Sequence, residues 1–398
     1  MNSDPDSMNT DTVRQIHDAV DEARLIDTAM QLIREPSPTR SAGAVADRLA
    51  QILQADGFSV ERPVADWPDA PAVAVRFDSG AAGRVLQFDG HLDTVHLPFV
   101  PPRHENGCLY GSGASDMKGG IAAFVEALRV LRETDTLQGG GVLLTAHDHH
   151  EGPWGDRRQL YALIREGYVG DAVLLPEYLA DCLPIAGRGM GIFEVRIGRD
   201  GEPVHEVFRP ADTPDVLAAG AHVVVECQNL AARVAHNTHE YAGQDTVFAG
   251  RIASGEIYNQ SPVECVVAGT RRWVTPGTIK AVEAEFDAML KDLAARTGTH
   301  IEHDFEVQGD AFRIAPDDPL VGAFQGAYSA CTGAPLPLGR KPFVDDGNSF
   351  ARLAGIPALT HGPAATGAHT LNEEVSVAEL VRVARVYALT AVSYSVTP

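Results

Sequence analysis

The chain has 398 residues, more than the ~250–300 at which a single hydrophobic core usually stops growing, so we expect two domains. Hydrophobic residues make up 44% and charged residues 22%, which allows a packed core and excludes wholesale disorder. The formal net charge of −22 argues against nucleic acid and anionic membranes as partners, because both require clustered lysine and arginine.

The cysteines and the lengths of the apolar runs indicate the cellular compartment in which the protein is expected. The five cysteines are odd in number and show no CxxC spacing, as expected of free thiols in a cytoplasmic protein. No apolar run approaches the ~20 residues of a membrane span, and residues 1–15 lack the apolar core of a signal peptide. Fifteen histidines, several beside acidic residues, point instead to a metal site.

The first half of the chain alternates helical and strand patterns. We predict helices at 11–34, 42–55, 117–134 and 157–166, and strands at 58–64, 72–77, 84–90, 141–146 and 171–176. Such an alternation predicts an α/β domain with a mostly parallel sheet flanked by helices.

The pattern changes after Gly187. We predict strands at 192–197, 246–254, 262–272 and 301–307, and helices at 214–234 and 279–297. This β-α-β-β-α-β order is typical of a small, ferredoxin-like α+β domain. The α/β pattern then returns at 319–332, 356–360 and 377–394. The sequence therefore predicts an α/β domain formed by residues 1–186 and 311–398, with an α+β domain inserted at 187–310.

His91 and Asp93 follow a predicted strand in the segment Phe88–Val95 (FDGHLDTV). In an extended chain they point the same way, so Asp93 can accept the second ring N–H of His91 and fix the tautomer that a metal ligand requires. Asp116 lies in the segment Gly111–Gly120 (GSGASDMKGG), which resembles a dinucleotide loop. Asp116 replaces the third glycine, however, and its carboxylate would repel a pyrophosphate. It could instead cap a helix or bridge two cations.

Three further clusters follow predicted strands. The segment Thr145–Gly152 (TAHDHHEG) is rich in histidine, Glu177 ends the apolar run Ala172–Pro176, and His369 lies in the segment Gly367–Glu373 (GAHTLNE). Taken singly, Glu177 and His369 are more often ordinary loop residues. Because open α/β sheets bind ligands at the ends of their strands, the clusters together predict a metal site.

In order and context these segments resemble the M20 family of metallo-aminohydrolases, which includes aminoacylases, acetylornithine deacetylase, succinyl-diaminopimelate desuccinylase and related carboxypeptidases. The resemblance covers nearly the whole chain and implies a co-catalytic dinuclear metal site with an inserted lid and dimerisation domain. It implies that His91 and Glu177 hold one metal, that Asp116 bridges, and that Glu151 with His369 holds the other. We expect one or two ions of Zn²⁺, Mn²⁺ or Co²⁺ per subunit.

The resemblance extends to the inserted domain. His205 resembles a family histidine that crosses the dimer interface and stabilises the oxyanion of the tetrahedral intermediate. Asn259 resembles a family asparagine that contacts substrate, and Arg271 or Arg272 lies near where the family can bind a substrate carboxylate. The other interpretation of the arginine pair is an exposed strand. The resemblance implies a homodimer or a higher oligomer.

The sequence departs from the family at the third cluster, where most members have adjacent glutamates acting as general base and metal ligand. Three assignments stay open: Glu151 as ligand with His150 as base, His150 as ligand with Glu151 as base, or Asp148 and His149 in place of the pair. We expect Glu151 to be indispensable because it precedes Gly152. A second departure lies in Asp345–Asn348 (DDGN), where Asp346 is a candidate substrate contact.

The leading functional prediction is hydrolysis of a C–N bond by metal-activated water, most simply the amide of an N-acyl amino acid or a small peptide-like molecule. An alternative is an aromatic aminohydrolase that releases ammonia by nucleophilic aromatic substitution, as in the nitroanthranilate aminohydrolase that resembles this family. A non-catalytic metal-binding protein is a third hypothesis. A serine hydrolase is disfavoured, because Gly347–Ala351 lacks the closing glycine of a nucleophile elbow.

Overall fold

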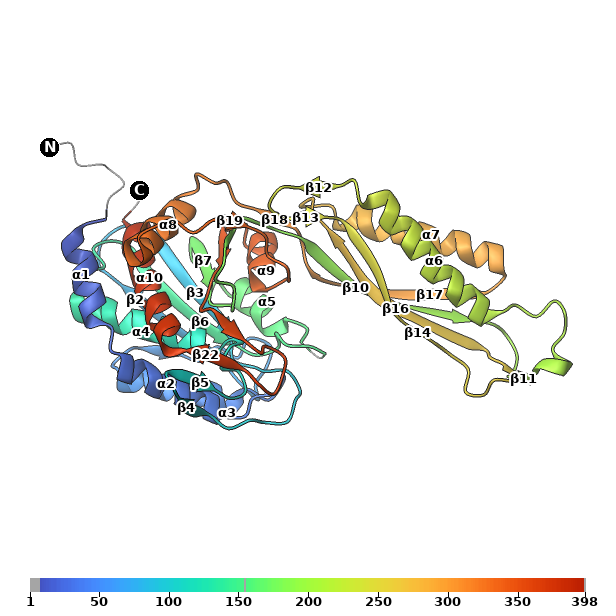
Figure 1. The fold of residues 1–398 in the computed structure, drawn as a ribbon, viewed down its shortest axis with the longest axis horizontal. Coiled ribbons are helices and arrows are strands. Elements are labelled where there is room, and N and C mark those ends of the chain that lie inside the picture. Colours follow the sequence, from blue (N-terminus) through green and yellow to red (C-terminus); the bar gives the residue numbers. More distant parts are fainter. Residues whose placement is uncertain (1–7, 154, 397–398) are drawn as a thin grey trace. The chain divides into compact units, whose positions relative to one another are not determined.

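The computed structural model describes residues 8–153 and 155–396. Residues 1–7, within the stretch expected to lack a signal peptide, lie outside the described part. Contacts divide the chain into two compact units, which we call the α/β domain and the inserted domain (Figure 1). Among the described residues, the α/β domain comprises those up to 185, 314–340 and 349–396, and the inserted domain comprises 186–313 and 341–348. Residues 341–348, expected from the sequence in the α/β domain, thus belong to the inserted domain.

A six-stranded sheet forms the centre of the α/β domain, in the order β1-β2-β6-β3-β7-β20. Its strands are β1 (Val60–Glu61), β2 (Val73–Asp78), β3 (Val85–His91), β6 (Gly141–His147), β7 (Ala172–Leu175) and β20 (Ala358–Thr360). The four strands from β6 to β20 are parallel, whereas β1 and β2 form an antiparallel edge. Every residue of β6 and β7 is buried, as expected for parallel strands covered on both faces. The α/β class with a mostly parallel sheet is confirmed.

The helices of this domain are α1 (Thr10–Ala19), α2 (Glu22–Arg34), α3 (Gly43–Ala55), α4 (Lys118–Thr134), α5 (Arg158–Arg165), α8 (Pro319–Thr332) and α10 (Val377–Ser395), while α9 (Asp346–Leu353) crosses the domain boundary. The prediction of one helix over 11–34 is wrong. Val20 leaves the helical conformation, and the side chain of Asp21 caps α2 by accepting from the N–H of Arg24. Helix α4 packs on β3, where Phe124 stacks on Phe88 at 4.4 Å.

Short strands that were not predicted complete this domain. A small sheet contains β4 (Arg103–Glu105), β5 (Cys108–Tyr110), β22 (Glu374–Ser376) and β21 (Ala365–Thr366), and a two-stranded pair joins β8 (Leu183–Pro184) to β19 (Leu338–Gly339). Pairing of β5 with β22 brings the segment before α4 next to the segment after β21. These are the segments that contain Asp116 and His369.

The inserted domain has an antiparallel sheet in the order β14-β16-β10-β17. Its strands are β10 (Gly189–Gly198), β14 (Thr246–Ser254), β16 (Glu264–Trp273) and β17 (His300–Gly309), with helices α6 (Val216–Val234) and α7 (Ile279–Thr297). Both helices lie on one face of the sheet (Figure 1). Phe193 of β10 packs against Phe286 of α7. Short elements are β9 (Ala186–Gly187) paired with β18 (Phe312–Arg313), β11 (Val204–His205) with β15 (Gln260–Ser261), β12 (Thr238–His239) with β13 (Gly243–Gln244), and the 3₁₀ turn Glu206–Phe208. The predicted α+β class of the insertion is confirmed.

All five cysteines are free. Across residues 8–153 and 155–396, none of the helices combines the length and apolar character that crossing a membrane requires.

His361, directly after β20, is a buried histidine enclosed by aromatic rings. Its ring centroid lies 4.9 Å from that of Phe324 and 5.7 Å from that of Tyr328. Among the residues that the structure describes, neither ring nitrogen of His361 has a hydrogen-bond partner. Burial, and to a smaller extent the charge of Arg382, holds the pKa of His361 well below its ordinary value.

We expect this histidine to make the fold acid-sensitive. The unfolded chain binds a proton at His361 near pH ~6.5 that the folded protein excludes, so the contribution of this group to stability is retained above that pH and falls by ~1.4 kcal/mol per pH unit below it. In His361→Leu this contribution to the slope should disappear, whereas the exposed His104→Leu should behave as the wild type. Free energies of unfolding in urea at pH values on either side of ~6.5 give the comparison. Parallel pH dependences for wild type and His361→Leu would contradict the expectation.

Candidate metal centre

His91 ends β3 with its side chain fully buried. Its Nδ1 lies 3.0 Å from the backbone carbonyl oxygen of Asp93 and 3.7 Å from the nearest carboxylate oxygen of Asp93. The carbonyl therefore accepts the Nδ1 proton, and the predicted role of the Asp93 carboxylate in orienting the ring is wrong. With Nδ1 protonated, the neutral ring presents the lone pair of Nε2, which lies 3.2 Å from Asp116 Oδ1 and has no hydrogen-bond partner among the described residues.

Asp116 lies between two histidines. Its Oδ1 is 3.2 Å from Nε2 of His91, and its Oδ2 is 3.2 Å from Nε2 of His369. The carboxylate of Glu373 fixes the preceding loop, since it accepts from the N–H groups of Gly113 (3.0 Å), Ser115 (3.2 Å) and Asp116 (3.3 Å). Two oxygens facing two imidazoles are the arrangement that a bridging carboxylate requires.

Close approach of α4 to the end of β7 depends on glycine. A Cβ atom on Gly120 would lie 2.4 Å from the carbonyl oxygen of Pro176, which is the residue before Glu177. The glycine therefore allows the first turn of α4, beside Asp116, to pack against the strand end that carries Glu177.

Glu151 and His369 face each other. Nε2 of His369 lies 3.2 Å from both carboxylate oxygens of Glu151. Hydrogen bonds with Asp116 and Glu151 raise the pKa of His369 to about 10, although burial opposes this shift. In His91, too, burial lowers the pKa, but Asp116 and the other nearby carboxylates raise it well above its ordinary value. Carboxylates that attract protons to both histidines create a negative potential that also suits a divalent cation.

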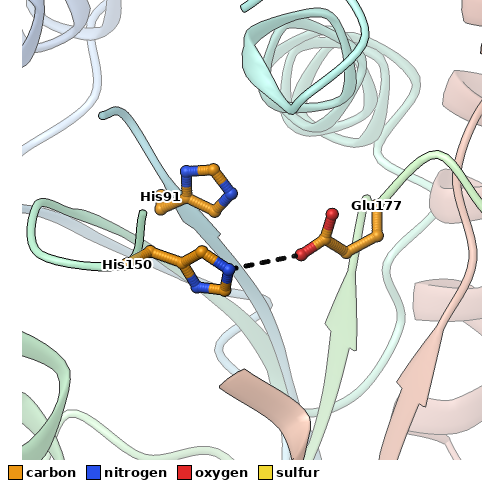
Figure 2. A group of neighbouring side chains, drawn as sticks. All are labelled: His91, His150 and Glu177. Atoms are coloured by element: carbon orange, nitrogen blue, oxygen red, sulfur yellow. Dashed lines mark ion pairs between the residues drawn. The ribbon is translucent and has the colours of Figure 1, made fainter. Parts of the chain in front are cut away.

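His150 lies beside the ring of His91 (Figure 2). The two rings stack with centroids 4.0 Å apart and an angle of 8° between their planes, and Nε2 of His150 is 3.9 Å from Oε1 of Glu177. The potential ligand atoms of His91, His150 and Glu177 lie within 4.8 Å of one another. Because a ring nitrogen binds a metal in the plane of its own ring, the two stacked rings would not both direct a nitrogen at one ion in this arrangement.

The side chains of Asp148 and His149 make contacts outside the group formed by His91, Asp116, Glu151 and His369. The carboxylate of Asp148 accepts from the N–H groups of Arg40 (2.9 Å), Ala42 (3.1 Å) and His149 (2.6 Å). The ring of His149 packs edge-on against Trp67 at 4.4 Å. The alternative in which these two residues replace the family's glutamate pair is therefore wrong.

The family assignment follows from comparison with known proteins. Residues 88–393 match the model of peptidase family M20/M25/M40. The chain belongs to this family. The resemblance inferred from the motifs is thereby confirmed, and the protein is an M20-type metal-dependent amidohydrolase.

Curated M20 relatives cover most of the chain. It is 30% identical to the succinyl-diaminopimelate desuccinylase of Methylobacterium sp. (strain 4-46), over 90% of this chain and 93% of that protein. The chain is also 30% identical to the succinyl-diaminopimelate desuccinylase of Gluconacetobacter diazotrophicus, over 90% of this chain and 94% of that protein.

Solved structures show the same fold at lower identity. Aminopeptidase PepT from Bacillus cereus superposes with a TM-score of 0.80 at 19% identity, over 94% of this chain and 99% of that one. The YXEP protein of Bacillus subtilis, described as a dinuclear metal binding peptidase from the M20 family, gives 0.69 at 17% identity, over 93% and 97% of the two chains.

The family residues expected in the inserted domain have different environments. His205 and Asn259 lie together, with 3.1 Å between Nε2 and Nδ2, on exposed neighbouring segments. Arg271 is buried and pairs with Asp245 at 3.0 Å, so its prediction as a substrate ligand is wrong; the residue stabilises the domain. Arg272 is half-buried, and its Nη1 has no hydrogen-bond partner in the described part of the chain.

Two buried side chains near the metal residues were not assigned from the sequence. Glu373 fixes the Asp116 loop, and Thr39 donates to Asp93 at 2.9 Å. Glu373 could have been identified from the sequence, because it is the acidic end of the motif Gly367–Glu373. No sequence signal identifies Thr39, which lies 54 residues before Asp93 and outside every motif. Asp346 is fully buried at the start of α9, and its role stays a prediction.

Proposed function

We propose that this M20 enzyme hydrolyses the amide bond of an N-acyl amino acid or a small peptide-like substrate. The observation that carries the proposal is Asp116, whose two carboxylate oxygens each lie 3.2 Å from a different histidine. The desuccinylase relatives support the substrate class.

Two ligand sets meet at Asp116. One comprises His91, Glu177 and Asp116, and the other comprises Glu151, His369 and Asp116. Mixed imidazole and carboxylate donors suit Zn²⁺, Mn²⁺ or Co²⁺, and Nε2 of buried His91, which makes no hydrogen bond among the described residues, fits a metal ligand. When bound, such ions polarise the scissile carbonyl and lower the pKa of a water molecule.

We assign Glu151 as a metal ligand and His150 as the general base. Glu151 faces His369 and belongs to a compact group with His91 and Asp116. His150 is adjacent but stacked out of the plane of His91. Its Nε2 takes the proton of the attacking water and returns it to the leaving amine.

We further propose that Arg272 binds the carboxylate of the substrate. Its guanidinium is half-buried and its Nη1 is unpaired among the described residues, so an anionic partner would satisfy it. Burial, and to a smaller extent the neighbouring Arg188, lowers the pKa of Arg272, and an anionic group paired with the guanidinium would offset this shift.

Arg272→Met should raise KM at least ~10-fold for a carboxylate substrate and change kcat much less, because the contact is made equally in the ground and transition states. The corresponding carboxamide substrate should be insensitive to the substitution. Arg251→Met, on the exposed face of β14, is the control and should behave as the wild type. Equal effects of Arg272→Met on carboxylate and carboxamide would contradict this role.

The function itself is tested by depleting metal with a chelator and restoring Zn²⁺, Mn²⁺ or Co²⁺ in turn. Each form is assayed on N-acetyl and N-succinyl amino acids, dipeptides and aminoaromatic acids, with free amine and ammonia measured separately. We expect metal-dependent release of amine and acid in equal amounts. Release of ammonia from an aminoaromatic acid would replace the proposal by the aromatic aminohydrolase, and metal-loaded protein without turnover would refute it.

A further inference from the structure

The carboxylate of Asp93 is the centre of a buried hydrogen-bond cluster. Its Oδ2 accepts from the backbone N–H groups of His150 (3.1 Å) and Glu151 (2.8 Å). A third donor, the hydroxyl of Thr39, lies 2.9 Å from the same oxygen. The backbone carbonyl of Asp93, and not its carboxylate, accepts from the ring of His91. The carboxylate of Asp93 therefore binds the loop after β6.

The Thr39 hydroxyl has three acceptors within reach and one proton to donate. It lies 2.9 Å from Asp93 Oδ2, 3.0 Å from the carbonyl oxygen of Glu151 and 3.5 Å from that of Thr94, which is the longest of the three. That carbonyl already accepts from the N–H of Gly155 at 2.7 Å. Since an ionised carboxylate is the stronger acceptor, the hydroxyl donates to Asp93.

The segment that carries Thr39 is itself fixed against the segment after β3. The N–H of Thr39 donates to the carbonyl of Thr94 (3.1 Å), and the N–H of Thr94 donates to that of Ser37 (2.8 Å). The hydroxyl of Ser37 donates to the carbonyl of Leu92 at 2.8 Å. Ser37 and Thr39 are each 1% exposed, so these bonds are shielded from water.

We propose that Thr39 is a positioning residue for the metal centre: its hydroxyl holds the Asp93 carboxylate, which in turn holds the backbone at Glu151. The inference rests on the proposed role of Glu151 as a ligand. Thr39 acts through Asp93, and its removal therefore weakens metal binding by allowing Glu151 to move.

Thr39→Val tests the inference, because it removes the hydroxyl and keeps the shape of the side chain. Calorimetric titration of the chelator-treated protein with Mn²⁺ should show a Kd about 10- to 100-fold weaker than that of the wild type, the usual effect of losing an outer hydrogen bond at a metal site. Thr39→Ser retains the hydroxyl and should stay within about threefold of the wild type. Thr39→Ala, which also lacks the hydroxyl, gives a second measurement if valine prevents folding.

Thr390→Val is the matched control, since Thr390 is equally buried but donates only within α10, to the carbonyl of Val386. It should leave the Kd unchanged. In an Asp93→Asn background, Thr39→Val should no longer alter the Kd appreciably, because its acceptor has lost its charge.

A wild-type Kd in folded Thr39→Val or Thr39→Ala would overturn the proposal, as would an equal loss in Thr390→Val. The titration requires no substrate. Absence of turnover would therefore refute the proposed function alone, and an unchanged Kd would refute the role of Thr39 alone.

Discussion

Glu151→Gln is expected to lower kcat by at least ~10²-fold and to lower metal occupancy at the same time. The amide keeps the size of the side chain but removes the charge that faces His369, with Nε2 to Oε distances of 3.2 Å. The fold should be retained, because the side chain faces a polar site and contributes no apolar packing. Metal analysis of the purified protein and kcat at rising metal concentration give the two readings, and excess metal should restore part of the rate.

His150→Gln should show the opposite behaviour. If His150 is the base, the variant keeps its metal and loses the rate, and excess metal does not restore it. Glu105→Gln, the same change as at Glu151 on the exposed strand β4, should affect neither quantity. Full metal occupancy with a slow, unrescued rate in Glu151→Gln would contradict the ligand assignment and make Glu151 the base.

The second large effect concerns assembly. We propose that the inserted domain forms the dimer interface and that His205 completes the active site of the partner. His205 and Asn259 lie together on exposed segments, and the edge strand β14 exposes Phe248 and Ile252. Exposed apolar side chains on an unpaired edge are typical of a surface that another chain covers.

His205→Ala and Asp116→Asn chains should each be nearly inactive alone and regain activity when co-expressed. Each mixed dimer would contain one complete site, because the His205→Ala chain has an intact metal centre and its partner supplies His205. Random pairing makes half of the dimers mixed, so about one quarter of wild-type activity is expected.

Co-expression of Asp116→Asn chains with chains that carry both substitutions is the control and should stay inactive. Light scattering checks that every preparation is dimeric. Folded mixed dimers with no activity above that of the parents would refute cross-subunit completion.

The long elements were predictable because their packing repeats with a regular period. Helix α7 begins and ends where its pattern of apolar residues predicted, and β6 was found from a run of apolar residues. The small sheet of β4, β5, β21 and β22 was not, since strands of two or three residues carry no periodicity and the pairing of β5 with β22 joins residues about 266 positions apart. The break at Val20 was missed because the apolar pattern continues across it.

At the site, motif order identified the residues that the structure brings together at Asp116. The sequence could not show which of two neighbouring side chains contributes to the site and which has another role. Arg271 and Arg272 are adjacent on one strand, but only the contact with Asp245 shows that Arg271 is committed to the domain's interior. The choice between His150 and Glu151 likewise depends on ring stacking, which no sequence pattern encodes.

Anomalous diffraction at the zinc edge from crystals soaked with Zn²⁺ tests the metal centre most directly. We expect one ion bound by Asp116, Glu151 and His369, and a second bound by Asp116, His91 and Glu177. The ring of His150 should remain outside both coordination spheres, because it stacks on His91. An ion bonded to His150, or Glu151 in contact with neither ion, would contradict the two proposed ligand sets and the role of His150 as the base.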